Sequence, residues 1–257
     1  MSIVIEVKAL TKRFGGLVAT NNVSFTTTAG HITGVIGPNG AGKSTLFNLI
    51  TGTIPLTSGT VHFYGEDITG LTPEQVAQRG MIRTFQSATV FKEKTTRDNL
   101  RIGMQFSRLG APSQLLDRAR VKAFRRDAER IADILLDFTR LEAYADRLAG
   151  ELPYGAQKTL GVAMALATEP KQLLMDEPAA GLNPVETEHM GQLIERIRSE
   201  RGIDVVLVEH DMGMVTSICD RIIVINRGEI IAVGTPDEIQ RNPDVIEAYL
   251  GADLEFD

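Results

Sequence analysis

One short stretch, Gly37–Thr45, constrains this chain more than any other. Its sequence, Gly-Pro-Asn-Gly-Ala-Gly-Lys-Ser-Thr, fits the pattern G-x-x-x-x-G-K-[ST]. The apolar run His31–Ile36 before it predicts a strand, and Thr45–Ile50 predicts the start of a helix. A glycine-rich turn at this place surrounds an anion with backbone N–H groups, because glycines let the backbone approach phosphate closely. The stretch therefore predicts a nucleotide phosphate site, in which Lys43 reaches the β- and γ-phosphates and Ser44 ligates Mg²⁺.

Composition limits the class of protein. The chain has 257 residues, a formal net charge of −6 and a single cysteine, Cys219. This length suits one large α/β domain with a smaller appended part, and the acidic balance gives no electrostatic footprint for nucleic acid. A lone cysteine excludes an internal disulfide and suits a reducing cytosol. No apolar run approaches the roughly 18 residues of a membrane helix, so we expect any membrane role to come through a partner.

The spacing of apolar and polar residues changes twice along the chain. Residues 3–35 alternate apolar and polar in short runs, which is typical of antiparallel strands. Residues 95–102, 113–138 and 155–167 carry helical spacing of apolar residues. Residues 172–233 then alternate apolar strands with helices. This order predicts a parallel-sheet core that is interrupted by a helical insertion.

Acidic residues and one histidine follow two of the predicted strands. Leu173–Met175 is an apolar strand followed by Asp176 and Glu177. An acid at the carboxyl end of a strand beside a phosphate loop can hold Mg²⁺, so we assign Asp176 to the metal and Glu177 to polarising the attacking water. Neighbouring side chains on a strand point to opposite sides, which predicts that these two acids do different work. His210 follows a later strand and is placed to hydrogen-bond the γ-phosphate or the water.

Gln86 ends the stretch Arg83–Gln86, just before the helical insertion. A glutamine at this place could contact the metal or the water and report the state of the nucleotide to the insertion. Judged by itself, Gln86 is a polar loop residue. The residues alone leave both interpretations open.

These pieces, in this order, resemble the ATP-binding subunit of ABC transporters over nearly the whole chain. Gly37–Thr45 matches the family's Walker A motif, Leu173–Asp176 its Walker B motif, Gln86 its Q-loop and His210 its switch histidine. The resemblance implies ATP and Mg²⁺ as cofactors. It also implies an α/β fold, with a P-loop NTPase (RecA-like) core and an N-terminal antiparallel β subdomain over residues 1–92 and 159–257, and a helical subdomain inserted over residues 93–158.

The segment Leu152–Lys158 matches the family's signature in place but only partly in letters. Pro153 stands where the family has serine, and Tyr154 and Ala156 also depart from its pattern. In this family the signature binds the γ-phosphate held by the opposite subunit. Because proline lacks a hydroxyl and a backbone N–H, two potential hydrogen-bond donors to the phosphate are missing. We therefore expect the ATP site that uses this signature to be impaired, and the site that uses Lys43 to be competent.

The tyrosine in the signature is similar to one subgroup, the larger ATPase of branched-chain (hydrophobic) amino-acid importers. The stretches 81–86, 178–184 and 245–251 resemble the same subgroup. The resemblance implies a second ATP-binding subunit, in a heterodimer in vivo or a homodimer in vitro, together with two transmembrane permease subunits and, indirectly, a periplasmic solute-binding protein. It places the chain at the cytoplasmic face of the inner membrane.

The complete set of expected site residues follows from the motifs and the resemblance together. We expect Glu177, His210 and Lys43 to be catalytic, and Ser44, Gln86 and Asp176 to surround the metal. The residues expected to contact ATP within one subunit are Phe14 (on the adenine), Gly37, Pro38, Asn39, Gly40, Ala41, Gly42, Lys43, Ser44, Thr45 and Gln86. Those expected to contact the ATP of the opposite subunit are Pro153, Tyr154, Gly155, Ala156 and Gln157.

Other functions remain open. A GTPase is one, since Asp67–Gly70 fits D-x-x-G, although the chain has no N-K-x-D tetrad. A soluble ABC protein of DNA repair or translation is another, although such chains usually join two cassettes. A transporter of urea, amides or another small solute, and a nucleotide-gated subunit with weak hydrolysis, are the remaining alternatives.

Overall fold

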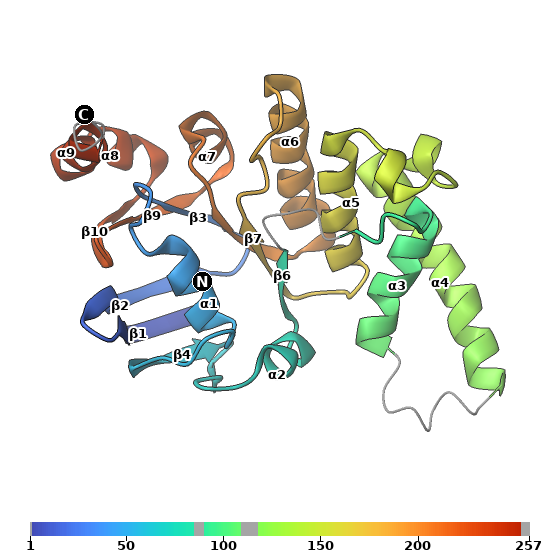
Figure 1. The fold of residues 1–257 in the computed structure, drawn as a ribbon, viewed down its shortest axis with the longest axis horizontal. Coiled ribbons are helices and arrows are strands. Elements are labelled where there is room, and N and C mark those ends of the chain that lie inside the picture. Colours follow the sequence, from blue (N-terminus) through green and yellow to red (C-terminus); the bar gives the residue numbers. More distant parts are fainter. Residues whose placement is uncertain (1, 85–89, 109–117, 253–257) are drawn as a thin grey trace.

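The computed structural model describes residues 2–84, 90–108 and 118–252, which form two β-sheets with helices around them (Figure 1). The order of strands in the smaller, antiparallel sheet is β2 (Leu17–Thr28), β1 (Ile3–Phe14), β4 (Ser58–Phe63) and β5 (Glu66–Asp67). The order in the larger sheet is β10 (Glu229–Gly234), β9 (Arg221–Asn226), β3 (Ile32–Ile36), β8 (Asp204–Val208), β7 (Gln172–Asp176) and β6 (Met81–Thr84).

The helices lie on both faces of the larger sheet. Figure 1 shows α1 between the two sheets and α5, α6 and α7 on the other side of the larger one. The helices are α1 (Lys43–Ile50), α2 (Pro73–Gln78), α3 (Thr96–Arg108), α4 (Arg118–Thr139), α5 (Tyr154–Leu166), α6 (Pro184–Arg201), α7 (Met212–Ile218), α8 (Pro236–Gln240) and α9 (Pro243–Ala252). Short 3₁₀ turns at Glu142–Tyr144 and Ala149–Glu151 join α4 to α5.

The middle of the larger sheet is buried on both faces. Every residue of β3, β7 and β8 is buried, as expected for parallel strands that are covered by helices on each side. Alternate side chains enter different cores: Leu173 and Met175 join the core under α5 and α6, whereas Leu174 joins the core that contains α1 and the smaller sheet. The predicted α/β fold with its N-terminal antiparallel sheet is confirmed.

The last strand differs from the sequence prediction. The sequence predicts a parallel-sheet core, and β10 is the exception within it, because it pairs antiparallel with β9. The reason lies in the turn between them, where Arg227 and Gly228 both have positive φ, 48° and 81°. Two successive residues of this kind form a tight hairpin whose twist matches that of the flanking strands. The chain therefore returns directly instead of crossing over through a helix.

Helices α3, α4 and α5 pack together at one end of the molecule (Figure 1). Their buried residues, such as Leu100, Leu135 and Leu160, belong to the same hydrophobic core as Leu173 of β7. Helix α5, which begins at the predicted signature, therefore connects this helical part to the strand that carries Asp176. Within the described part of the chain, no helix combines the length and the apolar character needed to cross a membrane.

Candidate functional site

The phosphate loop lies between the carboxyl end of β3 and the start of α1. Its glycines are required sterically: Gly42 has φ 104°, and a Cβ there would lie 2.5 Å from the Ala19 carbonyl oxygen. At Gly37, with φ 153°, a Cβ would lie 1.9 Å from the carbonyl oxygen of Ile225. Helix α1 has no side-chain hydrogen bond at its N-cap. Its first-turn N–H groups therefore suit an anion, as the motif predicts.

Lys43 is the first residue of α1, and its side chain turns back into the loop. Its Nζ donates hydrogen bonds to the carbonyl oxygens of Gly37, at 2.7 Å, and Pro38, at 2.9 Å. Burial lowers the pKa of this ammonium, and the charges of Glu177 and Asp176 oppose that shift. Lys43 thus faces the two acids that sequence analysis assigned to the same site, while Ser44 beside it is exposed.

Asp176 is the last residue of β7 and is almost fully buried. One of its oxygens accepts a hydrogen bond from Arg83 of β6, at 2.5 Å. The other terminal nitrogen of the same guanidinium donates to the Asn48 side-chain oxygen on α1, also at 2.5 Å. Sequence analysis gave Arg83 and Asn48 no role. A charged residue inside a strand of a buried parallel sheet was the signal that could have indicated Arg83.

Glu177 leaves the strand in a conformation that strand alternation does not predict. Its φ is 48°, in the left-handed region that only a few per cent of non-glycine residues adopt. Its N–H donates to the Val208 carbonyl oxygen, at 2.9 Å, and its own carbonyl oxygen accepts from Lys158 Nζ, at 3.1 Å. The left-handed backbone of Glu177 is thus held by contacts on both sides of the residue. Such local strain often marks functional sites.

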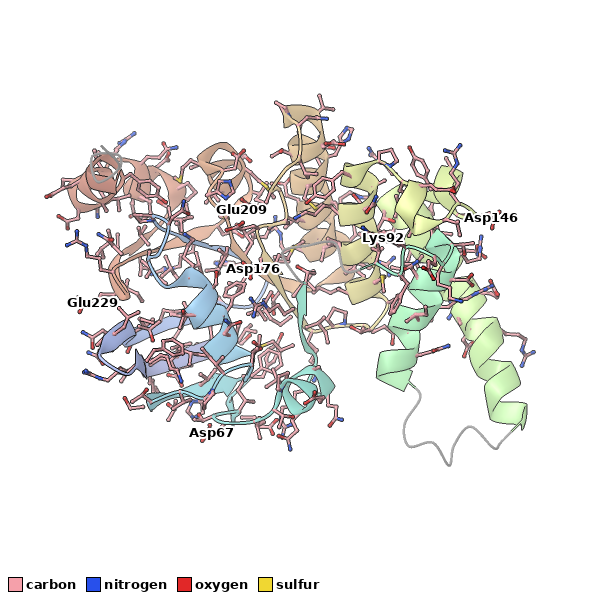
Figure 2. All side chains as sticks on the ribbon, viewed as in Figure 1. Asp67, Lys92, Asp146, Asp176, Glu209 and Glu229 are labelled. Carbon is pink, nitrogen blue, oxygen red and sulfur yellow. The ribbon has the colours of Figure 1, made fainter. Side chains whose placement is uncertain are left out.

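Glu209 is a further acid at this edge that sequence analysis passed over. Its side chain has no exposed surface, and its oxygens accept hydrogen bonds from the backbone N–H groups of Ala179, at 2.6 Å, and His210, at 3.1 Å. Burial raises the pKa of this carboxyl, and the hydrogen bonds from backbone N–H groups oppose that rise. Glu209 therefore ties the loop after β7 to the loop after β8. Figure 2 shows it near Asp176 in the middle of the molecule.

His210 follows Glu209 at the carboxyl edge of β8, and its side chain is 60% exposed. Its Nδ1 lies 3.8 Å from the nearer Glu209 oxygen, which forms an ion pair only when the imidazole is protonated. Because β3, β8 and β7 are neighbours in the sheet, the phosphate loop, His210 and the Asp176–Glu177 pair lie at one edge. The structure brings these predicted residues together.

The signature residues begin helix α5. Pro153 is its N-cap and makes no side-chain capping hydrogen bond, and the Gln157 side chain turns back to the Leu152 carbonyl oxygen, at 2.8 Å. Tyr154 is 47% exposed, with its hydroxyl 3.5 Å from the carbonyl oxygen of Ala180 in the loop after β7. The segment is therefore joined to the Glu177 loop, and its exposed face is available to another molecule.

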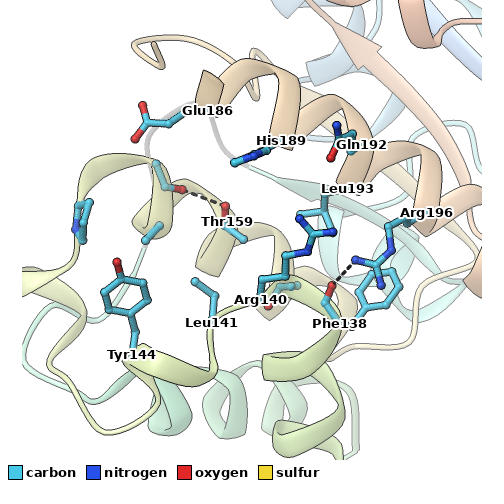
Figure 3. Close-up of a pocket in the computed structure, with 14 residues that line it drawn as sticks. Phe138, Arg140, Leu141, Tyr144, Thr159, Glu186, His189, Gln192, Leu193 and Arg196 are labelled. Carbon is cyan, nitrogen blue, oxygen red and sulfur yellow. Dashed lines mark hydrogen bonds between the residues drawn. The ribbon is translucent and has the colours of Figure 1, made fainter. Parts of the chain in front are cut away.

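A cavity of about 350 Å³ lies behind the signature, between α5, α6 and the end of α4. Figure 3 shows Glu186 and His189 of α6 on one side of it, and Leu141 and Tyr144 on the other. The Gly155 backbone forms part of its wall, and a Cβ at Gly155 would lie 2.5 Å from a Glu186 oxygen. A side chain at this position of the signature would therefore displace the Glu186 carboxylate.

The predicted contact with the adenine lies on the smaller sheet. The Phe14 ring at the end of β1 is 49% exposed, and Lys12 Nζ lies 4.8 Å from its centre, so the ring offers a free face for stacking. Gln86 lies outside the described residues. Asp67, the acid of the GTPase alternative, lies on β5 at the edge of the smaller sheet, far from Asp176 in Figure 2.

The residues at the site fit a magnesium ion held jointly with a nucleotide. Mg²⁺ prefers oxygen ligands and commonly takes one or two carboxylates together with substrate phosphates. Asp176 supplies a carboxylate and Ser44 an exposed hydroxyl, next to an uncapped helix start. Within the described ranges, no three His, Cys, Asp or Glu side chains gather as a metal site of their own. The donor set is thus one that phosphate oxygens would complete.

Comparison with known families gives two matches. The family described as ABC transporter matches residues 20–180, and the family described as branched-chain amino acid ATP-binding cassette transporter matches residues 229–255. Among curated proteins, the chain is 45% identical to the high-affinity branched-chain amino acid transport ATP-binding protein BraF of Pseudomonas aeruginosa, covering 96% of this chain and 98% of that one. It is 42% identical to the corresponding protein LivG of Escherichia coli K12, covering 96% and 97%.

Solved structures agree with these matches. A nucleotide-free ATP-binding cassette from an ABC transporter superimposes with a TM-score of 0.82 at 32% identity, covering 96% of this chain and 98% of that one. An ATP-binding cassette in its ADP conformation gives 0.84 at 31% identity, covering 98% and 100%. A dimeric bacterial ABC transporter cassette gives 0.76 at 26% identity, covering 90% and 98%.

Proposed function

Because this chain belongs to the ABC transporter family, as an ATP-binding subunit, we propose that it hydrolyses ATP to drive the import of branched-chain amino acids. The observation that carries the proposal is the meeting of the phosphate loop, the Asp176–Glu177 pair and His210 at the carboxyl ends of three adjacent strands. The solute assignment rests on the full-length similarity to branched-chain amino-acid transport proteins and on the match over residues 229–255.

In the proposed mechanism the protein positions ATP and stabilises charge. The α1 N-terminus and Lys43 hold the phosphates, after the Lys43 ammonium exchanges a loop carbonyl for a phosphate oxygen. Mg²⁺, held by Ser44, Asp176 and Gln86, would supply charge stabilisation on the phosphate oxygens. The Glu177 carboxylate accepts a proton from a water molecule while the oxygen of that water attacks the γ-phosphorus. The bond between the γ-phosphorus and the bridging oxygen breaks. His210 hydrogen-bonds the γ-phosphate.

In this proposal a partner subunit supplies the second half of each ATP site. We infer that two ATP-binding subunits close head to tail, with Pro153–Gln157 of this chain facing the partner's ATP. Because Pro153 at the α5 N-cap supplies neither a hydroxyl nor an N–H, the site completed by this signature is the weaker one in a heterodimer. Turnover is then lost more fully by Glu177→Gln than by the same change in the partner subunit. Equal losses would contradict this asymmetry.

The proposal also places the chain in a larger assembly. Residues 93–158 form the helical subdomain that passes closure of the ATP-binding subunits to two permease subunits, because ATP favours the closed state. The chain itself is peripheral to the membrane, and we place it at the cytoplasmic face of the inner membrane. A periplasmic solute-binding protein is an indirect partner. Phe14 stacks on the adenine.

Uptake of labelled leucine in cells tests the proposal. Cells that carry Glu177→Gln in place of the native chain are expected to lose uptake, whereas Glu229→Gln, a change at an exposed carboxylate on β10, is expected to leave it intact. Unchanged leucine uptake in the Glu177→Gln cells, with loss of urea or amide uptake instead, would move the solute to those classes. An ATP turnover of the purified complex that does not depend on Glu177 would favour a nucleotide-gated role.

A further inference from the structure

Arg83 joins three elements of the candidate site through a single side chain. It lies on β6, where it pairs with Leu174 of the neighbouring strand β7. One terminal nitrogen of its guanidinium donates to Asp176 at the end of β7, and the other donates to Asn48 on α1, both at 2.5 Å. The guanidinium therefore bridges the strand that ends in the proposed metal ligand and the helix that follows the phosphate loop.

This bridge is largely shielded from water, unlike an ordinary surface ion pair. The Arg83 and Asp176 side chains are 15% and 6% exposed, and the guanidinium carbon lies 5.8 Å from the centre of the Phe47 ring on α1. Exposed ion pairs hold geometry weakly because water competes for both partners. A buried guanidinium with two charge-assisted or polar contacts instead fixes the directions of the groups that it contacts, because its nitrogens lie in one rigid plane.

The two ends of the bridge correspond to the two halves of the proposed metal site. Asn48 is four residues after Ser44 on α1, so both lie on the same face of that helix, about one turn apart. Ser44 and Asp176 come from different elements, and a cation between them requires that α1 and β7 keep a fixed separation. Arg83 connects α1 to β7 at this level. Its contact with Asp176 uses one of the two carboxylate oxygens.

We propose that Arg83 is a positioning residue for the metal site. Its guanidinium holds the Asp176 carboxylate directly and the Ser44 turn of α1 through Asn48, at the separation that a nucleotide-bound Mg²⁺ needs. This inference rests on the proposed function. Groups that orient a metal ligand from behind commonly change metal affinity by about ten- to a hundredfold when they are removed. Lysine cannot replace arginine here, because a single ammonium lacks the fork that reaches both partners.

Two other roles for Arg83 predict different results. If the guanidinium competed with the cation for Asp176, its removal would strengthen metal binding. If it only stabilised the packing of β6 against α1, its removal would lower the thermal midpoint without a specific effect on the metal. The three roles are therefore distinguished by measuring ATP affinity with and without Mg²⁺, beside the thermal midpoint.

The experiment uses the full-length chain and four variants, Arg83→Lys, Asn48→Ala, the double variant, and Arg79→Lys as a control. Arg79 ends α2 and pairs with Glu66 at 2.8 Å on the surface, away from the site. ATP affinity is measured by titration calorimetry in Mg²⁺ and in EDTA. We expect Arg83→Lys to reduce the gain in affinity that Mg²⁺ provides by about ten- to a hundredfold, with the EDTA value within about twofold of wild type. Arg79→Lys is expected to match wild type.

Asn48→Ala keeps the Arg83–Asp176 contact and tests the bridge even if Arg83→Lys folds poorly. Asn48→Ala is expected to lose part of the gain in ATP affinity that Mg²⁺ provides. The double variant is expected to lose no more of this gain than Arg83→Lys alone, because both changes break the same bridge. The proposal would be overturned if Mg²⁺ raised the ATP affinity of Arg83→Lys by as much as, or more than, that of wild type. It would also be overturned if Arg83→Lys lost ATP affinity equally in Mg²⁺ and in EDTA. A wild-type protein whose ATP affinity ignores Mg²⁺ would instead overturn the proposed function.

Discussion

Replacing Glu209 by glutamine is expected to destabilise the protein although the two side chains have nearly the same shape. In the structure each carboxylate oxygen accepts a backbone N–H, from Ala179 at 2.6 Å and from His210 at 3.1 Å. A glutamine side chain offers one acceptor oxygen, and its NH₂ group would face the second N–H. The Glu209 side chain is completely buried, so the unmatched N–H cannot turn to water.

The size of the effect follows from that unmatched donor. Leaving a buried N–H without an acceptor costs about 1–3 kcal/mol. For a protein of this size, each kcal/mol lowers the thermal midpoint by about 2–4 °C, so we expect a fall of about 4–8 °C for a cost near the middle of that range. The measurement is differential scanning calorimetry of the two purified proteins. Glu229→Gln is the matched control, because Glu229 is exposed and accepts one hydrogen bond, from the Asn21 side chain at 2.6 Å.

The pH dependence reports the burial of the same carboxyl, because the hydrogen bonds from backbone N–H groups oppose the shift in its pKa. Burial raises the pKa of the Glu209 carboxyl above its ordinary value of 4.5, so the folded protein holds this proton more tightly than the unfolded chain does. The resulting stability is fully present below the unfolded pKa and is lost as pH rises through the folded pKa. The midpoint difference between wild type and Glu209→Gln is therefore expected to shrink as pH rises above 4.5. A midpoint within about 1 °C of wild type across this range would refute the account of Glu209.

Two further predictions concern the phosphate loop and the cysteine. Gly42→Ala is expected to weaken ATP binding more than Gly40→Ala does: both glycines have positive φ, 104° and 77°, but only at Gly42 would the new Cβ meet backbone, 2.5 Å from the Ala19 carbonyl oxygen. Equal losses by calorimetry would remove the steric argument. Burial raises the pKa of the Cys219 thiol to about 12, so a thiol reagent at pH 8 is expected to label it slowly in the native protein and rapidly in urea. Rapid labelling of the native protein would contradict that burial.

The sequence predicted the elements whose signals are local. Strands β3, β7 and β8 could be recognised because every one of their residues is buried, which makes their sequences mostly apolar. Helices α2 and α8 were missed although each begins with a readable capping box, Thr72 with Gln75 and Thr235 with Glu238. The direction of β10 could not be read from periodicity, because it depends on two residues with positive φ in the preceding turn.

The candidate site shows the same division. The phosphate loop, Asp176, Glu177 and His210 follow from spacing, since each comes directly after a predicted strand. The contacts of Arg83 with Asn48 and Asp176 join residues that are 35 and 93 positions apart, and sequence spacing does not reveal them. The left-handed backbone of Glu177 depends in the same way on distant partners that hold it in place.

The charges at this edge of the sheet determine what a bound triphosphate needs for its own charge to be compensated. Three buried or half-buried cations lie near three acids. The cations are Lys43, Arg83 and Lys158, and the acids are Asp176, Glu177 and Glu209. Each cation already has a partner within the chain: Lys43 the loop carbonyls, Arg83 a carboxylate, and Lys158 the Glu177 carbonyl oxygen. An entering triphosphate adds negative charge to a set that is already balanced, in surroundings where charges interact more strongly than in water. Backbone N–H groups compensate part of this charge, and under the proposed function Mg²⁺ and the signature of a second subunit supply the rest, so an isolated chain without Mg²⁺ is expected to hold ATP weakly.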